Sequence, residues 1–137
     1  MDIATWDNTP PFVPNFGEGK VIKCYDGDTI TVAAHLINDK HPERVYRFNL
    51  RILGVDTPEI RSNNPEEKER ALFVRDRLHT LLFGTTVRVH VVGNDKYGGR
   101  LLAHVWTQHE QSVSEYLLRN EYAVPYDGGA KKAWEPV

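Results

Sequence analysis

Three acidic and two arginine side chains fall at the ends of predicted strands: Asp28, Arg51, Asp56, Glu59 and Arg100. Asp28 and Asp56 are placed to share one divalent cation, and carboxylates suit hard ions such as calcium or magnesium. Phosphodiester hydrolysis needs an activated water, a cation on the non-bridging oxygens, and positive charge where the pentacovalent state becomes negative. Glu59 would activate the water, and the cation would bind the non-bridging oxygens. The two arginines would supply the positive charge, because guanidinium keeps its proton and bridges two phosphate oxygens.

The loop after the third predicted strand must bend for this set to converge. Arg51 and Asp56 are five residues apart, which puts them on opposite faces of a flat strand. A bulge or bend after Ile52 is therefore required, and Gly54 is the residue that can provide it. Pro58 then stops the strand and stiffens the exit loop, so that neighbouring ligands are held still.

The strands and helices that position these residues can be predicted from the spacing of apolar residues and from helix-capping residues. Alternating apolar residues predict a hairpin turning at Asp26-Gly27 and three further strands. Asn64 and Pro65 match a helix N-cap and first turn, which predicts a helix over about 65–83. A second short helix opens at the capping box of residues 112–115, and residues 126–137 have room for one or two weak turns. The strands are expected over residues 20–25, 30–36, 47–52, 87–91 and 102–107.

This order of elements is typical of one fold. Three strands, a helix, two strands and a final helix predict a five-stranded OB-fold Greek-key barrel, a mainly β fold with helices (α+β). Its main helix lies between the third and fourth strands, with a short C-terminal helix or two. An SH3-like barrel does not need so long a helix. Residues 1–19, with three prolines, are expected to form an extended arm, and residues 20–137 a single domain.

The composition argues against several classes of protein. The chain has 137 residues, of which 40% are hydrophobic, and a net charge of −2. It has no apolar run of 18 residues and no basic, apolar leader, which argues against a membrane protein or an exported one. The single Cys24 excludes an internal disulfide and a cysteine-based zinc site, which fits a reducing, cytoplasmic location. The charge alone does not suggest a nucleic-acid partner.

Three motifs together resemble one family. They are D-G-D-T at 26–29, R-x-x-x-V-D-T-P-E at 51–59 and D-K-Y-G-x-R at 95–100. They look like those of the staphylococcal nuclease (thermonuclease-like) family, and the resemblance extends from about residue 20 to about residue 126. It implies an OB barrel with calcium-dependent hydrolysis of DNA and RNA that leaves 3′-phosphate ends. Ca²⁺ is the implied cofactor, with Mg²⁺ or Mn²⁺ as alternatives.

The resemblance also implies a role for each motif residue. Asp28 and Asp56 are expected to bind the calcium ion through their carboxylates, and Thr57 through its main-chain carbonyl. Glu59 is expected to position or deprotonate the attacking water, while Arg51 and Arg100 are expected to bind the scissile phosphate.

Three further residues are carried over from the same motifs. Lys96 and Tyr97 resemble the family's contacts to the terminal phosphate of the nucleotide. Tyr126 stands near the family's base-stacking tyrosines.

The chain departs from the family pattern at three places. Gly99 is inserted before Arg100, Glu121 stands where the family has glycine, and the C-terminal helix is shortened to about residues 130–134. The chain is also slightly acidic, whereas the best-known members are basic and exported. Weaker and more salt-sensitive binding of nucleic acid is therefore expected, because each lost phosphate contact lowers affinity.

Three functions remain open on the sequence. The first is a monomeric nuclease, acting away from membranes, that prefers single-stranded DNA and RNA because its site must reach a splayed backbone. The second is a catalytically silent OB-fold module that binds nucleic acid or protein, and the third is a phosphodiesterase for small nucleotides. All five acidic and arginine side chains of the motifs are present, which favours the enzyme over the silent module.

Overall fold

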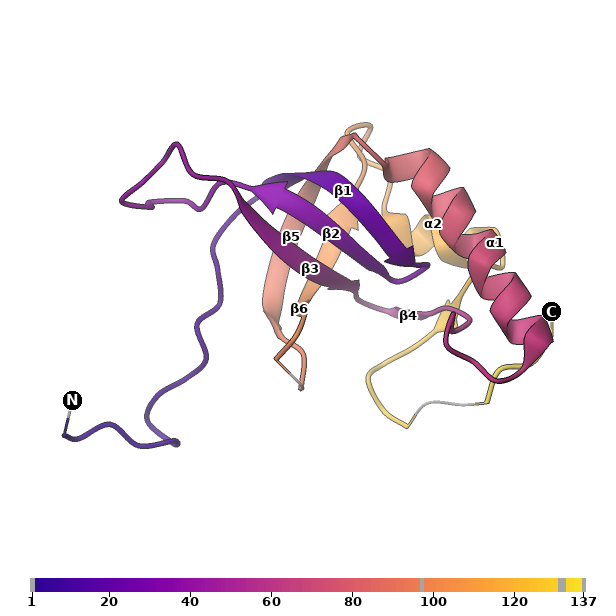
Figure 1. The fold of residues 1–137 in the computed structure, drawn as a ribbon, viewed down its shortest axis with the longest axis horizontal. Helices are drawn as coiled ribbons and strands as arrows, with labels where there is room; N and C mark the ends of the chain where they lie inside the picture. Colours follow the sequence, from indigo (N-terminus) through magenta and orange to yellow (C-terminus); the bar gives the residue numbers. More distant parts are fainter. Residues whose placement is uncertain (1, 97, 131–132, 137) are drawn as a thin grey trace.

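A closed barrel forms the body of the protein. The computed structural model describes residues 2–96, 98–130 and 133–136. Within these residues the elements are β1 (Glu18–Asp26), β2 (Thr29–Ala34), β3 (Tyr46–Ile52), β4 (Val55–Asp56), α1 (Pro65–Leu82), β5 (Thr86–Asn94), β6 (Leu101–Trp106), α2 (Val113–Arg119) and β7 (Val124–Pro125). Five strands close in the order β1-β2-β3-β6-β5 (Figure 1).

The pairing within the barrel confirms the predicted OB fold. Neighbouring barrel strands are antiparallel except β3 and β6, which pair in parallel. Helix α1 lies between the third and fourth barrel strands in the chain, as predicted, and α2 follows the last barrel strand. Neither helix in the described part of the chain is long and apolar enough to cross a membrane.

Helix α1 begins where the sequence indicates. The side chain of Asn64 accepts hydrogen bonds from the main-chain N–H groups of Glu66 and Glu67 at 3.0 and 3.5 Å, and Pro65 occupies the first turn. The helix ends at Leu82, one residue before the predicted end. Its buried face packs on β1. The buried residues of α1 are Ala71, Val74, Leu78 and Leu82.

The turn between β1 and β2 is packed tightly against its surroundings. A Cβ atom on Gly27 would lie 2.6 Å from Cγ1 of Val74 and 2.8 Å from Cγ2 of Thr57. Only glycine permits that approach, since real Cβ atoms do not come so close to a neighbour. The turn that carries Asp28 is therefore fixed against both α1 and the loop after β4.

The chain bends sharply after β3. Gly54 has a φ of +87°, a conformation that glycine adopts without strain. The bend leads into the two-residue strand β4, which pairs with β7. The sequence predicted the bend but neither short strand, because a two-residue pairing between distant segments leaves no local periodic pattern.

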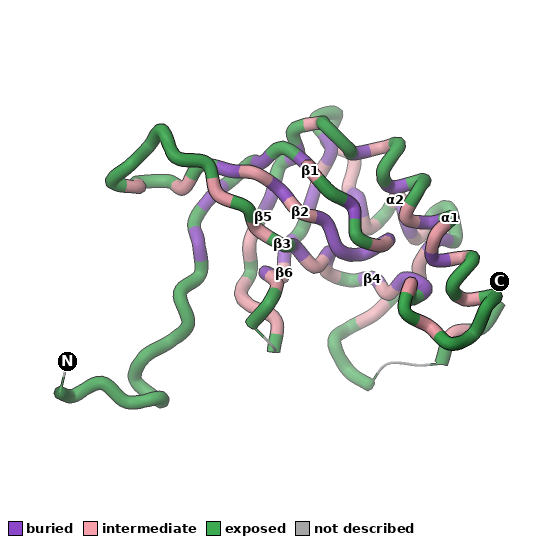
Figure 2. Tube along the Cα trace, in the orientation of Figure 1, coloured by how far each residue is buried: buried purple, intermediate pink, exposed green. Residues whose placement is uncertain are grey.

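The core fills the barrel interior and the space under α1 (Figure 2). It begins before the first strand, because Phe16 is buried and stacks on Phe48 with ring centroids 4.6 Å apart. Strand β1 starts at Glu18, two residues earlier than expected. Residues 2–13 are exposed and extend away from the barrel (Figures 1 and 2).

The end of the chain contains one of the expected short helices. Helix α2 opens at the predicted capping residue Ser112, whose side chain accepts from the N–H of Glu115 at 3.3 Å. The expected helical turn at 130–134 does not occur in the described residues 130, 133 and 134, and residues 131–132 lie outside the described part. Before it, the Tyr126 hydroxyl donates to the Gly129 carbonyl at 2.7 Å, which closes a non-helical turn.

Candidate active site

Arg51 joins the two acidic residues predicted to share a cation. Its Nη1 lies 3.4 Å from Oδ2 of Asp28, and its Nη2 lies 3.8 Å from Oδ1 of Asp56. All three side chains are between 8 and 12% exposed. Nη1 also donates to the main-chain carbonyl of Ile52 at 2.8 Å, which fixes the orientation of the guanidinium group. The bend at Gly54 is what returns Asp56 to the side of the chain on which Arg51 lies.

Asp28 is held by its neighbours along the chain and across the barrel. Its Oδ1 accepts from the hydroxyl of Thr29 at 3.1 Å, and its Oδ2 accepts from the N–H of Thr57 at 3.5 Å. Its main-chain carbonyl accepts from the N–H of Ile52 at 2.8 Å. These bonds connect the β1–β2 turn to both ends of the bend, which brings the segments that carry the predicted metal ligands together.

Asp26 belongs to the same acidic cluster, although it was not among the predicted site residues. Burial, and then the charge of Asp28, raise the pKa of Asp26 to about 7. Its Oδ1 accepts from the N–H of Asp28 at 3.1 Å. The signal was available in the sequence, because only Gly27 separates the two acidic residues in the predicted turn. Asp26 therefore keeps its proton up to about pH 7 beside Asp28.

Arg100 reaches this end of the barrel despite the inserted glycine. Its Nη1 donates to Oγ1 of Thr29 at 3.0 Å, and its Nε donates to Oδ2 of Asp95 at 3.0 Å. The loop before it absorbs the extra residue: Gly98 has a φ of +75°, and the N–H of Gly99 donates to Oδ1 of Asp95 at 3.2 Å. Thr29 pairs across the sheet with Arg51, so both arginines lie beside the same residue of β2.

Glu59 lies on the exit loop, which is tied to α1. Its side chain is exposed, and the buried Pro58 precedes it. The N–H of Glu59 donates to Oε2 of Glu67 at 3.0 Å, and the hydroxyl of Ser62 donates to Oε1 of the same residue at 2.7 Å. Glu67 therefore fixes the loop that presents Glu59. This role of Glu67 was not predicted from the sequence.

The three residues predicted to contact the nucleotide lie in different surroundings or outside the described residues. Tyr126 lies over the site: its ring centroid is 5.8 Å from Cζ of Arg51, and its N–H donates to the carbonyl of Gly54 at 3.0 Å. Lys96 is exposed on the loop between β5 and β6. Tyr97 lies outside the described residues.

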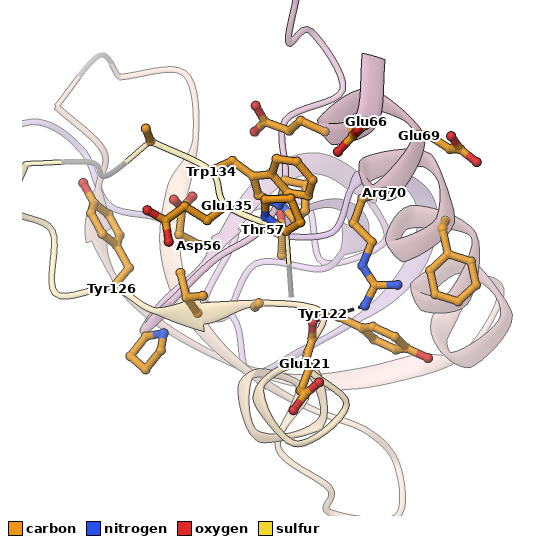
Figure 3. A pocket seen from close by; sticks show the side chains of 18 of the residues that line it. Asp56, Thr57, Glu66, Glu69, Arg70, Glu121, Tyr122, Tyr126, Trp134 and Glu135 are labelled. Carbon is orange, nitrogen blue, oxygen red and sulfur yellow. Dashed lines mark hydrogen bonds between the residues drawn. The ribbon is translucent and has the colours of Figure 1, made fainter. Parts of the chain in front are cut away.

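A groove of about 1460 Å³ opens from Asp56 and Thr57 toward α1 (Figure 3). Tyr126 borders it on one side and Arg70 on the other, with Trp134 between them in the view of Figure 3. Arg70 is the one cation among the described residues that line it, and its Nη2 donates to the carbonyl of Glu121 at 3.2 Å. The acidic lining residues other than Asp56 are Glu66, Glu67, Glu69, Glu121, Asp127 and Glu135.

The acidic end of the barrel fits a hard divalent cation. Asp28 and Asp56 converge on one guanidinium, and Asp26 adds a third acidic group whose raised pKa reflects burial and the nearby charge of Asp28. In the described part of the chain, no group of three or more acidic, histidine or cysteine side chains is arranged to hold a metal ion. Ca²⁺ takes six to eight oxygen ligands, so two carboxylates and a carbonyl leave the other positions to water and to substrate.

Comparison with known proteins identifies the family. The family model described as "Staphylococcal nuclease homologue" matches residues 49–134. The chain is 35% identical over 118 residues to the thermonuclease of Staphylococcus hyicus, an alignment that covers 77% of this chain. The chain spans 60% of the length of that relative. With its OB barrel and its acid-and-arginine cluster, this protein belongs to the staphylococcal nuclease family.

Proposed function

We propose that this protein is a calcium-dependent nuclease that hydrolyses phosphodiester bonds in DNA and RNA and leaves 3′-phosphate ends. The observation that carries the proposal is the contact of Arg51 with both Asp28 and Asp56. It places a guanidinium, which suits phosphate, beside two carboxylates that suit a hard cation. The family and the thermonuclease relative support nuclease activity.

The cation would be held by the carboxylates of Asp28 and Asp56 and the carbonyl of Thr57. Ca²⁺, with Mg²⁺ or Mn²⁺ as alternatives, supplies positive charge on the non-bridging phosphate oxygens when bound. Glu59, presented by the loop that Glu67 fixes, orients the attacking water and accepts its proton.

The two arginines and Tyr126 complete the proposed roles. Arg51 and Arg100 bind the scissile phosphate and stabilise the negative charge that accumulates on it. Both guanidinium groups are already fixed by hydrogen bonds, so little reorganisation is needed during the reaction. Tyr126 stacks on a base next to the cleaved bond, which favours single strands whose bases are accessible. Lys96 and Tyr97 contact the terminal phosphate, and the enzyme acts as a monomer.

The direct test is cleavage of labelled single-stranded DNA and RNA with Ca²⁺, Mg²⁺, Mn²⁺ or EDTA. We expect calcium-dependent cleavage with 3′-phosphate products, abolished by EDTA. Glu59→Gln should reduce cleavage at least about 100-fold, the scale of general-base catalysis. Glu43→Gln, on an exposed loop between β2 and β3, is the matched control and should cleave like the wild type. A folded wild type that is inert with every metal but still binds oligonucleotides would instead identify the silent binding module.

One observation favours a second candidate, a phosphodiesterase for small nucleotides. Beyond Asp56 the groove is lined by six further carboxylates and by one guanidinium among its described residues. A long polyanion lying in that groove would be repelled, whereas a dinucleotide would not have to enter it. Comparing cleavage of dinucleotides and long polymers separates the two: activity confined to dinucleotides supports the second candidate.

A further inference from the structure

Two histidines face each other on the outside of the barrel, on strands that the proposed catalytic roles do not use. His90 on β5 pairs directly with His104 on β6 in the antiparallel register. Both residues are exposed, and their ring centroids are 6.0 Å apart with the ring planes 29° from parallel. The residues that flank each histidine along its strand, such as Val89 and Val105, point into the core and anchor both strands.

This spacing suits two ligands of one metal ion. Metal–nitrogen bonds of about 2.0–2.1 Å put two coordinating nitrogens at most roughly 4.2 Å apart. Each ring nitrogen lies off its ring centroid, so rings with centroids 6.0 Å apart can bring facing nitrogens into that range. Exposed imidazoles make this adjustment by rotation about χ2, which is a soft torsion. The backbone register already supplies the approach of the two side chains.

Both histidines are exposed to solvent, and their neighbours on the same face pack against each other. Arg88 stands two residues before His90, but its guanidinium is held 4.7 Å from the ring centroid of Trp106. Trp106 in turn lies 6.1 Å from the ring of His104. The described residues contain no group of three or more candidate ligands, so a metal ion here would have two protein ligands, and water would fill its remaining positions.

We propose that His90 and His104 form a two-histidine binding site for a borderline transition-metal ion, of the class of Zn²⁺, Cu²⁺ or Ni²⁺. Imidazole nitrogen suits these ions, whereas Ca²⁺ and Mg²⁺ require oxygen ligands. The site therefore differs in chemistry from the carboxylate cluster around Asp28. Once one histidine binds the ion, the second is already positioned beside it, so the pair binds more tightly than either residue alone.

A bound ion would clamp the hairpin that carries Arg100. Strand β5 ends at Asn94 and β6 begins at Leu101, directly after Arg100. Joining His90 to His104 fixes the two strands together beneath this loop. An ion that binds only the folded hairpin stabilises the folded protein by mass action.

The test uses the full chain without a histidine tag, stripped of metal and then held in excess Ca²⁺ to occupy the carboxylate cluster. Cu²⁺ is titrated while tryptophan fluorescence is followed, because Trp106 lies beside His104. Zn²⁺ is then added during thermal unfolding. We expect quenching that saturates at one equivalent of Cu²⁺ and a melting temperature that rises by several degrees with Zn²⁺.

Variants locate the site. His90→Gln and His104→Gln should each weaken Cu²⁺ binding about tenfold or more and abolish the Zn²⁺ stabilisation. His109→Gln, in the turn after β6, is the matched control and should behave like the wild type. Trp106→Phe should keep the Zn²⁺ stabilisation and lose most of the quenching. Unchanged Cu²⁺ affinity in either of the two strand variants, with their circular dichroism spectra like that of the wild type, would overturn the proposal.

Discussion

The guanidinium of Arg100 donates from Nη1 to the hydroxyl oxygen of Thr29 at 3.0 Å. The same hydroxyl donates to Oδ1 of Asp28 at 3.1 Å. Thr29 therefore links the arginine of one loop to a proposed metal ligand in another turn. A single hydroxyl thus bridges the two groups by hydrogen bonds.

Replacing Thr29 tests this link. Thr29→Val keeps the branched shape but removes the acceptor for Arg100 and the donor to Asp28, so kcat should fall about 10- to 100-fold by misplacement of the arginine. Thr29→Ser should retain most activity, because it keeps the hydroxyl. Thr31→Val, which removes an exposed hydroxyl on the same strand, is the control and should leave kcat unchanged. Equal activity of the valine and serine variants at position 29 would contradict the link.

Arg51 should affect catalysis and calcium binding in opposite directions. Arg51→Ala should lower kcat about 10²- to 10³-fold, the scale for losing one group that stabilises transition-state charge. It should also tighten Ca²⁺ binding, because Asp28 and Asp56 lose the cation between them. Calorimetric titration of Ca²⁺ beside steady-state kinetics measures both effects. Arg51→Lys keeps the charge, so its Ca²⁺ affinity should stay near that of the wild type while kcat still falls.

Gly27→Ala should disturb the site through packing alone. The added methyl would lie 2.6 Å from Val74 and 2.8 Å from Thr57, so the β1–β2 turn must shift. We expect a loss of about 1–3 kcal/mol in the free energy of unfolding, together with weaker Ca²⁺ binding. Gly17→Ala is the control, because nothing lies within 4 Å of its added Cβ. Urea unfolding and Ca²⁺ titration of both variants check the prediction, and equal stabilities would refute it.

Asp26 should make the calcium-free protein less stable as the pH rises. Its pKa is about 7 in the folded protein against 3.8 for the ordinary carboxyl, so the folded state binds more protons between these values. The free energy of unfolding should therefore fall between about pH 4 and pH 7, by on the order of 1 kcal/mol per pH unit at most. Asp26→Asn should remove this slope and be the more stable form at pH 8 in EDTA. Asp7→Asn, in the exposed arm, should keep the slope of the wild type.

Replacing Glu121 with glycine should stabilise the folded protein. It follows α2 with a φ of +59°, where a side chain is strained, while the N–H of Tyr122 donates to the carbonyl of Leu117 at 2.9 Å to close the helix end. Glu121→Gly should raise the free energy of unfolding by about 1 kcal/mol. Glu121→Ala, which keeps the Cβ, should not. Urea unfolding distinguishes these outcomes, and a glycine variant no more stable than the alanine variant would rule out strain as the cause.

The sequence predicted those features that depend on local signals. Asn64 and Pro65 located the start of α1, apolar alternation located the barrel strands, and the need to bring Arg51 to Asp56 located the bend at Gly54. Features that depend on contacts across the fold were not predicted. Thr29 between two charged groups and Glu67 behind the Glu59 loop both arise from side chains meeting across separate elements.

The effect of the inserted Gly99 also could not be predicted from the sequence. The sequence shows an extra residue before Arg100 but not how the turn accommodates it. In the structure, the carboxylate of Asp95 accepts hydrogen bonds from the N–H of Gly99 and from Nε of Arg100. These two bonds hold the longer turn together and direct the arginine toward β2. That outcome depends on hydrogen-bond geometry within the turn, which the spacing of residues in a sequence does not contain.

The parallel pairing of β3 with β6 determines when the active site can exist during synthesis of the chain. Leu50 pairs with Leu101, so Arg100 joins Arg51 only after α1 and β5 have been made. Chains emerge from the ribosome N-terminal end first, and contacts between residues distant in sequence form slowly. A nascent chain that ends with β5 carries Asp28, Arg51 and Asp56 but lacks Arg100, so the proposed catalytic set is complete only after the loop that follows β5 has been made.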